Sequence, residues 1–402
     1  MLTSEPQAAR DGMPYSTSLR NFHHERPVSR QQNAIPIRDE DAMKRTRHPS
    51  LFAVCLLAAL IVPFSLRAAD KPAAQKPLNG DKAIVPGGIW LDDRGIPIQA
   101  HGGGILLYKH TYYWFGEDRS PSNDPAKRYV ACYSSQDLTH WKYHRQVLAI
   151  SAPENLGPHF VLERPKVFYN ARTKKFVMYM HLDGAKYAEA RVAVAVSDKI
   201  DGDYAYKTSF RPLNQESRDI GQFIDDDGSA YLIFESRPTK GFFIAKLSDD
   251  YMTVEKQISF IQAPLEGGAV VHYKGKYYVL GSHMTGWKPN PDVYAVADSL
   301  SGPWSTFKDI APPEVNTYGS QSSMLLKVAG SKTTTVIYMG DQWKPKELSD
   351  SRYLWMPLEM GPDPTQPGAM HLPKPQPWSI NIKSGEVKTS GAVETTLDAP
   401  AR

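Results

Sequence analysis

A β-hairpin pattern recurs along this chain and limits the folds that it can adopt. In residues 265–287 (LEGGAVVHYKGKYYVLGSHMTGW), two β-rich segments flank a KGK turn, and a single acid, Glu266, stands at the entrance. Four other stretches share this plan, at residues 104–116, 167–181, 223–235 and 324–340. The chain therefore repeats one antiparallel unit along most of its length.

The spacing of these repeats predicts a β-propeller. The return strands are marked by Tyr112, Phe176, Tyr231, Tyr277 and Ile337, in steps of 64, 55, 46 and 60 residues. Such steps are around the length of a four-stranded propeller blade. A third β-rich segment follows each hairpin, and long helical periodicity is absent, which argues against helical and α/β folds. We therefore predict an all-β fold, a five-bladed β-propeller of four-stranded antiparallel blades.

Residues 43–69 (MKRTRHPSLFAVCLLAALIVPFSLRAA) have the pattern of a secretory signal peptide. A charged start precedes an apolar core, and the small residues Ala68 and Ala69 mark a cleavage neighbourhood. The core has about 14 residues and is interrupted by Pro63, whereas a membrane span needs roughly 20. We therefore expect a periplasmic or secreted protein with no membrane attachment after cleavage. Residues 1–42 are interpreted as an upstream extension from a mis-set translation start.

The remaining chain is balanced in charge. Without residues 1–69 it holds 38 basic and 37 acidic residues, so nucleic-acid binding loses its main support. Cys132 is the only cysteine left, which excludes an intrachain disulfide. We expect a linker at 70–85, one propeller catalytic domain at 86–388, a tail at 389–402, and a monomer.

One polar residue stands just before the first strand of each hairpin. The innermost strands of a propeller line its central channel, so equivalent positions converge on one axis. Like charges gathered in a partly desolvated pocket cost free energy, and stability alone gives no reason to place them there. Each acid could be satisfied locally, but their common register favours a functional pocket. The positions are His101, Glu163, Asp219, Glu266 and Gln321.

Several carboxyls around a small pocket suit glycoside hydrolysis. One carboxyl must stay protonated to donate to the leaving oxygen, and inversion needs a group on the other side of the sugar ring that holds a water. Aromatic faces can bind the sugar, although each aromatic residue by itself is more often part of the core. The aromatic candidates are Trp114, Tyr187, Trp287, Tyr318 and Trp343. The predicted partner is a polysaccharide or oligosaccharide substrate.

Short motifs in a fixed order resemble glycoside hydrolase family 43, and more narrowly its exo-β-1,3-galactanase (galactan 1,3-β-galactosidase) branch. They are AHGGGIL, YYWFGE, ERPKV, SRDIGQFIDDDG, LEGG and YGSQSSMLL, and the resemblance covers about residues 86–382. It implies that Glu266 is the general acid, that Asp219 raises the pKa of Glu266 and orients it, and that Glu163 binds sugar hydroxyls where cleavage occurs. The expected sugar-binding set also includes Arg164, Glu117, Tyr187, His101, Trp287 and Tyr318.

The catalytic base is where this sequence departs from the wider family. Most members carry a base Asp in the first blade, where this chain has His101 followed by three glycines. The galactanase branch shares this loss and is thought to use a Gln in the fifth blade, which Gln321 matches. A neutral amide can only hold the water or join a proton relay as its imidic acid form. Glu117 is the competing candidate, with a sugar contact or an ion pair with Arg119 as its alternative role.

The expected function is an exported, inverting, exo-acting hydrolase that releases galactose from β-1,3-galactan, such as the arabinogalactan backbone. The alternatives are another activity of the family (α-L-arabinofuranosidase or β-xylosidase) and a non-catalytic sugar-binding propeller. We expect no cofactor and leave open a structural cation in the channel. The consecutive acids at 225–227 fit a hairpin turn better than a calcium loop, so no metal site is predicted.

Overall fold

The computed structural model describes residues 83–362 and 369–389. The predicted upstream extension (1–42) and signal peptide (43–69) lie outside these residues, as do most of the predicted linker (70–85) and tail (389–402). In the part of the chain that the structure describes, no helix is long and apolar enough to cross a membrane.

Five antiparallel sheets follow one another along the chain, each with neighbouring strands in sequence order. The first holds β1 (His101–Tyr108), β2 (Thr111–Glu117), β3 (Lys127–Ser135) and β4 (Lys142–Ser151). The second holds β5 (Val161–Asn170), β6 (Lys175–Asp183), β7 (Arg191–Ser197) and β8 (Ala205–Phe210). The third holds β9 (Ile220–Ile224), β10 (Ala230–Ser236), β11 (Gly241–Leu247) and β12 (Val254–Ile261).

The last two sheets complete the series. The fourth holds β13 (Leu265–Tyr273), β14 (Lys276–His283), β15 (Asp292–Ala297) and β16 (Lys308–Asp309). The fifth pairs three strands within the described residues, β17 (Gln321–Ala329), β18 (Thr334–Gln342) and β19 (Arg352–Pro357). Two small sheets follow, β20 (Glu359–Met360) with β21 (Met370–His371), and β22 (Trp378–Ile380) with β23 (Val387–Thr389).

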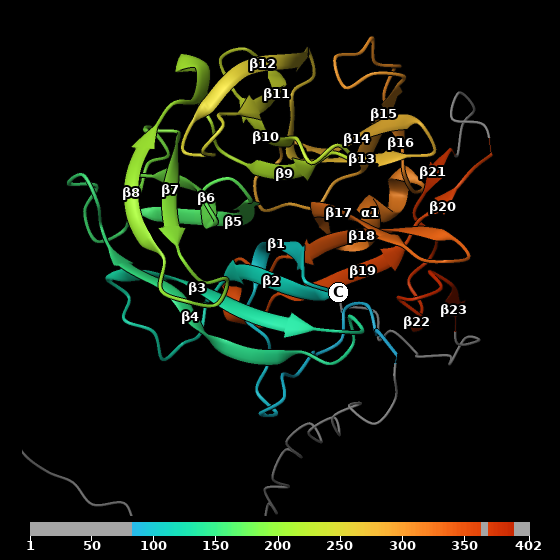
Figure 1. Cartoon of the computed structure of the whole chain (residues 1–402), viewed down its shortest axis with the longest axis horizontal. Helices are drawn as coiled ribbons and strands as arrows, with labels where there is room; N and C mark the ends of the chain where they lie inside the picture. The colour runs from blue at the N-terminus through green and yellow to red at the C-terminus, as the bar shows by residue number, and fades with distance from the viewer. Residues whose placement is uncertain (1–82, 363–368, 390–402) are drawn as a thin grey trace, which may run out of the picture. The chain divides into compact units, whose positions relative to one another are not determined.

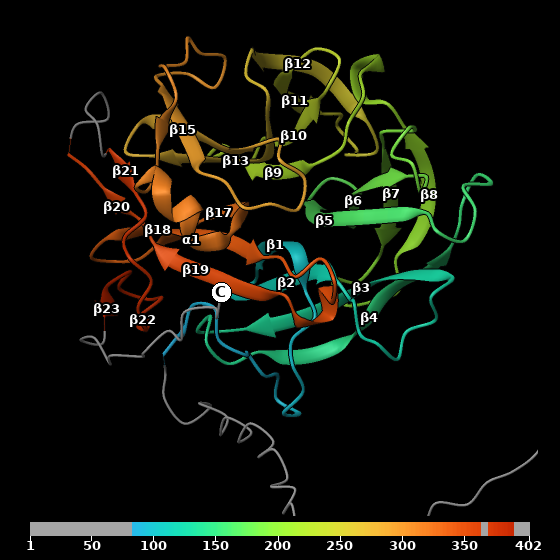
Figure 2. The same ribbon diagram turned by 180° about the vertical axis from the view of Figure 1, so that it is seen from behind.

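The five sheets are arranged as blades around one axis (Figure 1). β1, β5, β9, β13 and β17 are the innermost strands, and each contacts the next around the ring, with β17 contacting β1. The view from behind shows the same ring (Figure 2). This arrangement confirms the predicted five-bladed β-propeller.

The ring is joined where the first and fifth blades meet. Ile84 pairs with Trp378, and the amide of Gly87 donates to the Tyr353 carbonyl of β19 at 2.8 Å. The segment that leads into the first blade is therefore bound to the last one. Trp114 lies in this junction, fully buried, with its ring 4.7 Å from that of Trp355. Trp114 is thus a core residue and not a sugar-binding residue. Core packing was the alternative role that the sequence analysis gave for each aromatic candidate.

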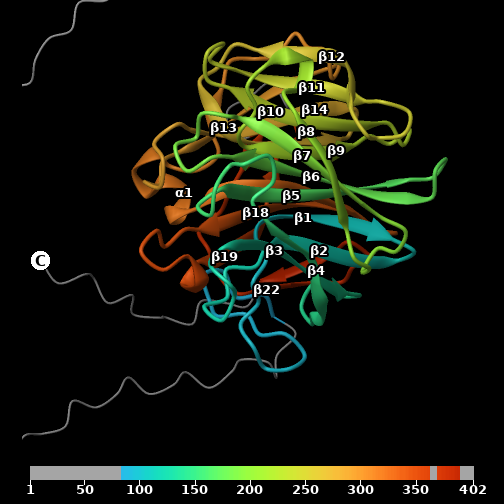
Figure 3. The same cartoon turned by 90° about the vertical axis from the view of Figure 1, so that its left-hand side faces the viewer.

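Both faces of a blade pack on neighbouring blades, so the inner strands have long apolar runs rather than strict alternation. In β6 (KFVMYMHLD), every residue after Lys175 is buried. The short helical elements are confined to connections: η1 (Pro212–Asn214), η2 (Pro313–Val315), α1 (Asn316–Gly319) and η3 (Leu348–Asp350). Seen from the side, α1 lies at one end of the propeller axis, directly before β17 (Figure 3).

A β-bulge interrupts the pairing at the same place in four blades. The register shifts begin at His101, Glu163, Glu266 and Ser322. After the first three, the next residue has a positive φ, 57° at Gly102, 51° at Arg164 and 65° at Gly267. A bulge re-aims the side chains beside it, and here it lies next to residues of the predicted pocket. Glycine adopts this conformation freely, whereas Arg164 must be held in it by its contacts.

Candidate active site

A cavity of about 260 Å³ is lined by residues from all five blades. Its lining residues are Glu117, Glu163, Arg164, Tyr187, Asp219, Arg237, Glu266, Gly286, Trp287, Gln321 and Trp343. The structure thus brings together eight of the ten residues that the sequence assigns to catalysis or sugar binding, together with Trp343, a further aromatic candidate. The other two, His101 and Tyr318, do not line this cavity.

The site is built from two rings of polar residues. We call His101, Glu163, Asp219, Glu266 and Gln321 the inner ring, because each lies within two residues of the start of an innermost strand. We call their cross-strand partners the second ring: Glu117, His181, Glu235, Ser282 and Asp341. The second-ring residues are at most 3 % exposed. Each inner-ring side chain therefore has a buried polar neighbour.

Arg164 joins these residues at the centre of the site. Its Nη2 lies 2.9 Å from Asp219 Oδ2 and donates to Gln321 Oε1 at 2.6 Å, while Nη1 donates to the Ser322 carbonyl at 3.0 Å. Its backbone N–H donates to Glu117 Oε1 at 2.9 Å. Arg164 therefore orients groups from the first blade through its backbone, and from the third and fifth blades through its side chain. These contacts explain how a non-glycine residue keeps a positive φ at the bulge.

Glu266 is a carboxyl kept in its acid form at neutral pH. It is 5 % exposed, and burial together with the nearby charge of Asp219 raises the pKa of Glu266 to about 8. Glu266 Oε1 accepts from Gln321 Nε2 at 3.2 Å, and Oε2 lies 3.5 Å from Arg237 Nη2. Asp219 also accepts the Gly267 backbone N–H at 3.1 Å, so it fixes the bulge beside Glu266.

Glu117 and Glu163 share the guanidinium of Arg119. Arg119 Nε donates to Glu117 Oε2 at 2.8 Å, and its Nη2 lies 3.5 Å from Glu163 Oε1. Burial raises the pKa of Glu117, and the charge of Glu163 adds to this against the opposing effect of Arg119. Burial also disfavours the ionised form of Glu163, but contacts with His181, Arg119 and Tyr187 outweigh it and lower the pKa of Glu163. Of the two carboxyls, Glu163 is therefore the one whose surroundings favour the ionised form.

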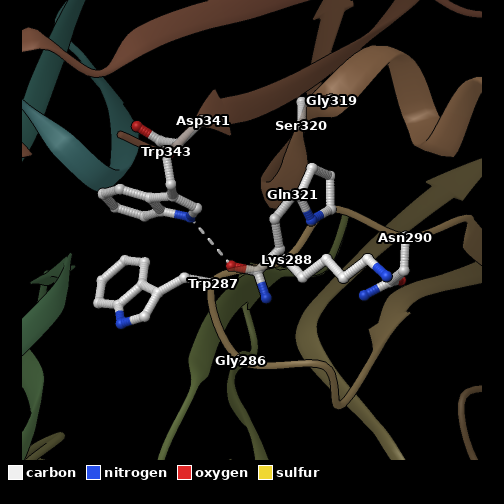
Figure 4. A pocket seen from close by; sticks show the side chains of 10 residues that line it. Gly286, Trp287, Lys288, Asn290, Gly319, Ser320, Gln321, Asp341 and Trp343 are labelled. Carbon is white, nitrogen blue, oxygen red and sulfur yellow. Dashed lines mark hydrogen bonds between the residues drawn. The ribbon is translucent and has the colours of Figure 1, made fainter. Parts of the chain in front are cut away.

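The other wall of the cavity is aromatic. The rings of Trp287 and Trp343 meet edge to face, with centroids 5.4 Å apart, and Trp287 is 44 % exposed. Figure 4 shows both indoles beside Gln321, with the Trp343 nitrogen directed at the amide oxygen. That nitrogen donates to Gln321 Oε1 at 3.1 Å, while Gln321 Nε2 also donates to Ser282 Oγ at 3.1 Å. An apolar face with directed donors is suited to one face of a sugar ring.

The two predicted residues outside the cavity serve packing and connection. His101 is fully buried, its ring stacked on Tyr353 with centroids 5.1 Å apart, and its Nδ1 lies 3.5 Å from Asp341 Oδ1. The carbonyl of Tyr318 accepts from Gln342 Nε2 at 2.8 Å.

Sequence reasoning missed Arg237 in the cavity and the whole second ring apart from Glu117. A signal for the second ring exists in the sequence, because the apolar run of every return strand meets a polar residue near its end: FGE, YMH, FE, LGS and MGD. Which inner-ring residue each of these polar residues faces depends on the register between the first two strands of the blade. Sequence periodicity alone does not determine this register.

Two further polar clusters lie outside the cavity lining. Asp225, Asp226 and His272 could offer three ligand atoms to a metal ion, but Lys327 already forms an ion pair with Asp226. Lys166 is fully buried and its Nζ donates to the carbonyls of Gly102 and Gly103 at 2.6 and 2.9 Å. Burial lowers the pKa of Lys166 to about 7. The expectations for metals and cofactors stay predictions.

A buried acid, an ionised carboxylate, an oriented amide and an aromatic wall in one propeller cavity are the features of a glycosidase. Comparison with known proteins agrees. Residues 100–340 match the model of Glycosyl hydrolases family 43, and the chain belongs to this family. It is accordingly a glycoside hydrolase.

Two solved structures show which branch of the family this chain resembles. An exo-β-1,3-galactanase from Phanerochaete chrysosporium, solved with β-1,3-galactotriose, is 39 % identical, with 77 % of this chain and 71 % of that chain covered and a TM-score of 0.71. An exo-β-1,3-galactanase from Clostridium thermocellum is 34 % identical, with 77 % and 69 % covered and a TM-score of 0.69. The resemblance to the galactanase branch is therefore confirmed.

A curated relative shows the variation within the family. The extracellular endo-α-(1→5)-L-arabinanase 2 of Bacillus subtilis is 24 % identical over 227 residues. The match covers 49 % of this chain and 42 % of the arabinanase, so the chain spans less than half the length of that relative.

The interaction between Asp219 and Glu266 can be tested through pH. If Glu266 is the general acid, activity is expected to fall as the pH rises through about 8, the pKa of this carboxyl. Asp219→Asn removes a negative charge that raises this pKa, so the alkaline limb of the profile of kcat/KM against pH is expected to move down by about one pH unit. Asp227→Asn, in an exposed turn of the same blade, serves as the control and leaves the limb in place. An unmoved limb in Asp219→Asn contradicts the assignment.

Proposed function

We propose that this protein is an exo-acting β-1,3-galactanase that releases galactose with inversion. The observation that carries the proposal is Glu266, a carboxyl protonated at neutral pH at the cavity wall, in direct contact with the Gln321 amide. The choice of galactan is supported by the two solved relatives whose names specify exo-β-1,3-galactanase activity.

In this proposal Glu266 is the general acid. It donates its proton to the glycosidic oxygen as the bond to the anomeric carbon breaks. The carboxylate that forms is stabilised by Gln321 Nε2 and by the guanidinium of Arg237, 3.5 Å from Oε2. Glu163 and Tyr187 bind sugar hydroxyls, and Trp287 with Trp343 forms the apolar wall.

Gln321 holds the attacking water in this proposal, and the proton that the water loses as it adds to the anomeric carbon passes to solvent. Its Oε1 accepts two N–H donors, from Arg164 and Trp343. This arrangement suits the amide form, since the hydroxyl of an imidic acid would need an acceptor. Both Nε2 contacts are also occupied, by Glu266 and Ser282. A water can therefore bind Gln321 only if substrate entry replaces one of these contacts. Glu117 remains the competing candidate for the base.

The acid assignment is tested by the leaving group. A general acid contributes about a hundred- to ten-thousand-fold, so Glu266→Gln is expected to lose that much turnover on β-1,3-galactan. The loss is smaller on an aryl galactoside, whose leaving group needs little protonation. Released galactose is measured, with arabinan and xylan as comparison substrates and NMR to follow the anomer, which is α first if the reaction inverts. Glu255→Gln, on the outer strand β12, is the control. Wild-type turnover on galactan in Glu266→Gln rules the assignment out.

The group on the water's face is tested by rescue. Gln321→Ala is expected to lose turnover on galactan and on the aryl galactoside alike, because the water must be positioned whatever the leaving group is. External azide can replace the water only where a side chain on that face has been removed. Comparing azide rescue in Gln321→Ala and Glu117→Ala identifies the residue, and rescue of the Glu117 variant alone would transfer the role to Glu117.

We also propose that the protein is exported. The proposal rests on the signal-like residues 43–69 and on the extracellular location named for the arabinanase relative. Expression from Met43 is expected to give a periplasmic or secreted product whose N-terminus lies near Ala68, as read by mass spectrometry. A membrane-bound, uncleaved chain contradicts export by this route.

A further inference from the structure

We propose that His181 is a positioning residue whose imidazolium fixes both the Glu163 carboxylate and the loop that carries Tyr187, so that sugar binding depends on it. This inference rests on the proposed function in one respect, namely that Glu163 and Tyr187 bind the sugar. His181 lies in β6 as the second-ring partner of Glu163 and does not line the cavity.

His181 lies between two carboxylates. Its Nδ1 is 3.3 Å from Glu163 Oε2, and its Nε2 is 3.2 Å from Asp183 Oδ2. The side chains of His181 and Asp183 are 1 % and 0 % exposed. A neutral imidazole has one N–H and one lone pair, so one of the two carboxylates would face the lone pair. The doubly protonated ring suits both neighbours.

The charges around the ring favour the imidazolium. Burial by itself lowers the pKa of His181, but Asp183, Glu163 and the more distant Asp219 outweigh it and raise the pKa to about 9. Tyr187 also faces the ring, with centroids 5.9 Å apart. His181 is therefore charged at neutral pH, which is the state that keeps Glu163 ionised.

The other carboxylate, Asp183, anchors the loop between β6 and β7. Its Oδ1 accepts the backbone N–H groups of Gly184 at 2.9 Å and Glu189 at 2.8 Å, and its Oδ2 accepts that of Ala190 at 3.0 Å. Tyr187 lies in this loop with a φ of 53°, and its hydroxyl donates to Glu163 Oε1 at 3.2 Å. Tyr187 of this loop and His181 therefore contact the same carboxylate, that of Glu163.

Among the second-ring residues, His181 is the one that can carry a positive charge. In the third blade the corresponding pair is Asp219 and Glu235, two acids, and there burial and the charge of Asp219 raise the pKa of Glu235 to about 7. The second blade therefore keeps its inner carboxyl ionised, whereas in the third and fourth blades the pKa of Glu235 and that of Glu266 are raised. An ionised Glu163 accepts hydrogen bonds from sugar hydroxyls, which a protonated one does less well.

Kinetics separate positioning from a general effect on folding. In His181→Asn we expect KM for β-1,3-galactotriose to rise by about tenfold or more, because the Glu163 carboxylate loses its charged partner, with a smaller change in kcat. A residue that serves only stability would lower the amount of active enzyme and leave KM unchanged. His144→Asn is the matched control, because His144 also pairs with an aspartate, Asp201 at 3.0 Å, but in the outer strand β4. An unchanged KM in His181→Asn overturns the proposal.

Nuclear magnetic resonance of the ¹⁵N-histidine-labelled full chain tests the charge directly. We expect both ring nitrogens of His181 to be protonated at pH 7, and the ring to titrate at lower pH in Glu163→Gln, where one negative neighbour is gone. This variant supplies the test if His181→Asn does not fold. A singly protonated ring, or a titration unchanged by Glu163→Gln, overturns the proposal. The ring signal is measured without substrate, so this test does not depend on activity. A wild type inactive on galactan would refute the galactanase proposal, and the charge state of His181 could still be determined.

Discussion

The site depends on the guanidinium of Arg164, which is buried with its charge paired to Asp219. Several carboxyls in one cavity repel each other, and a buried charge is tolerated only when it is paired and hydrogen-bonded. Arg164 reduces the repulsion because its charge is paired with that of Asp219. Its own buried charge is hydrogen-bonded as well, to Gln321 and to the Ser322 carbonyl. The bulge in β5 makes this possible by turning the Arg164 side chain into the ring rather than along the strand.

The neighbours of each inner-ring carboxyl determine what that carboxyl can do. Glu163 faces a histidine and is held ionised, while Glu266 is buried near Asp219 and is held protonated. Similar carboxyls thus receive different chemical roles from their neighbours. Separate charge states are what glycoside hydrolysis needs, because sugar binding uses acceptors and departure of the leaving group uses an acid. The propeller supplies this by repeating one position with a different residue in each blade.

Much of this could be predicted from the sequence. The hairpin repeat led to the five-bladed propeller, and the residue before each hairpin led to the inner ring. Glu266, Asp219, Gln321 and Glu163 all line the cavity as expected. His101 occupies the equivalent position in the first blade, yet it is buried against Tyr353 and Asp341. Equivalence in sequence places a residue at the right level of a blade, but packing decides where its side chain goes.

The sequence by itself determined the blade architecture and the set of polar residues near the axis, because both follow from local periodicity and from repetition at one register. Only the tertiary structure decided their charge states and partners. Arg164 meets Gln321 across 157 positions and Glu117 across 47 positions of the chain, and such contacts leave no periodic trace in the sequence. The pKa of Glu266 likewise depends on burial and on Asp219, 47 residues earlier. Desolvation and charge proximity are properties of the folded ring, which is why the chemistry of the site emerges only when the blades close on one another.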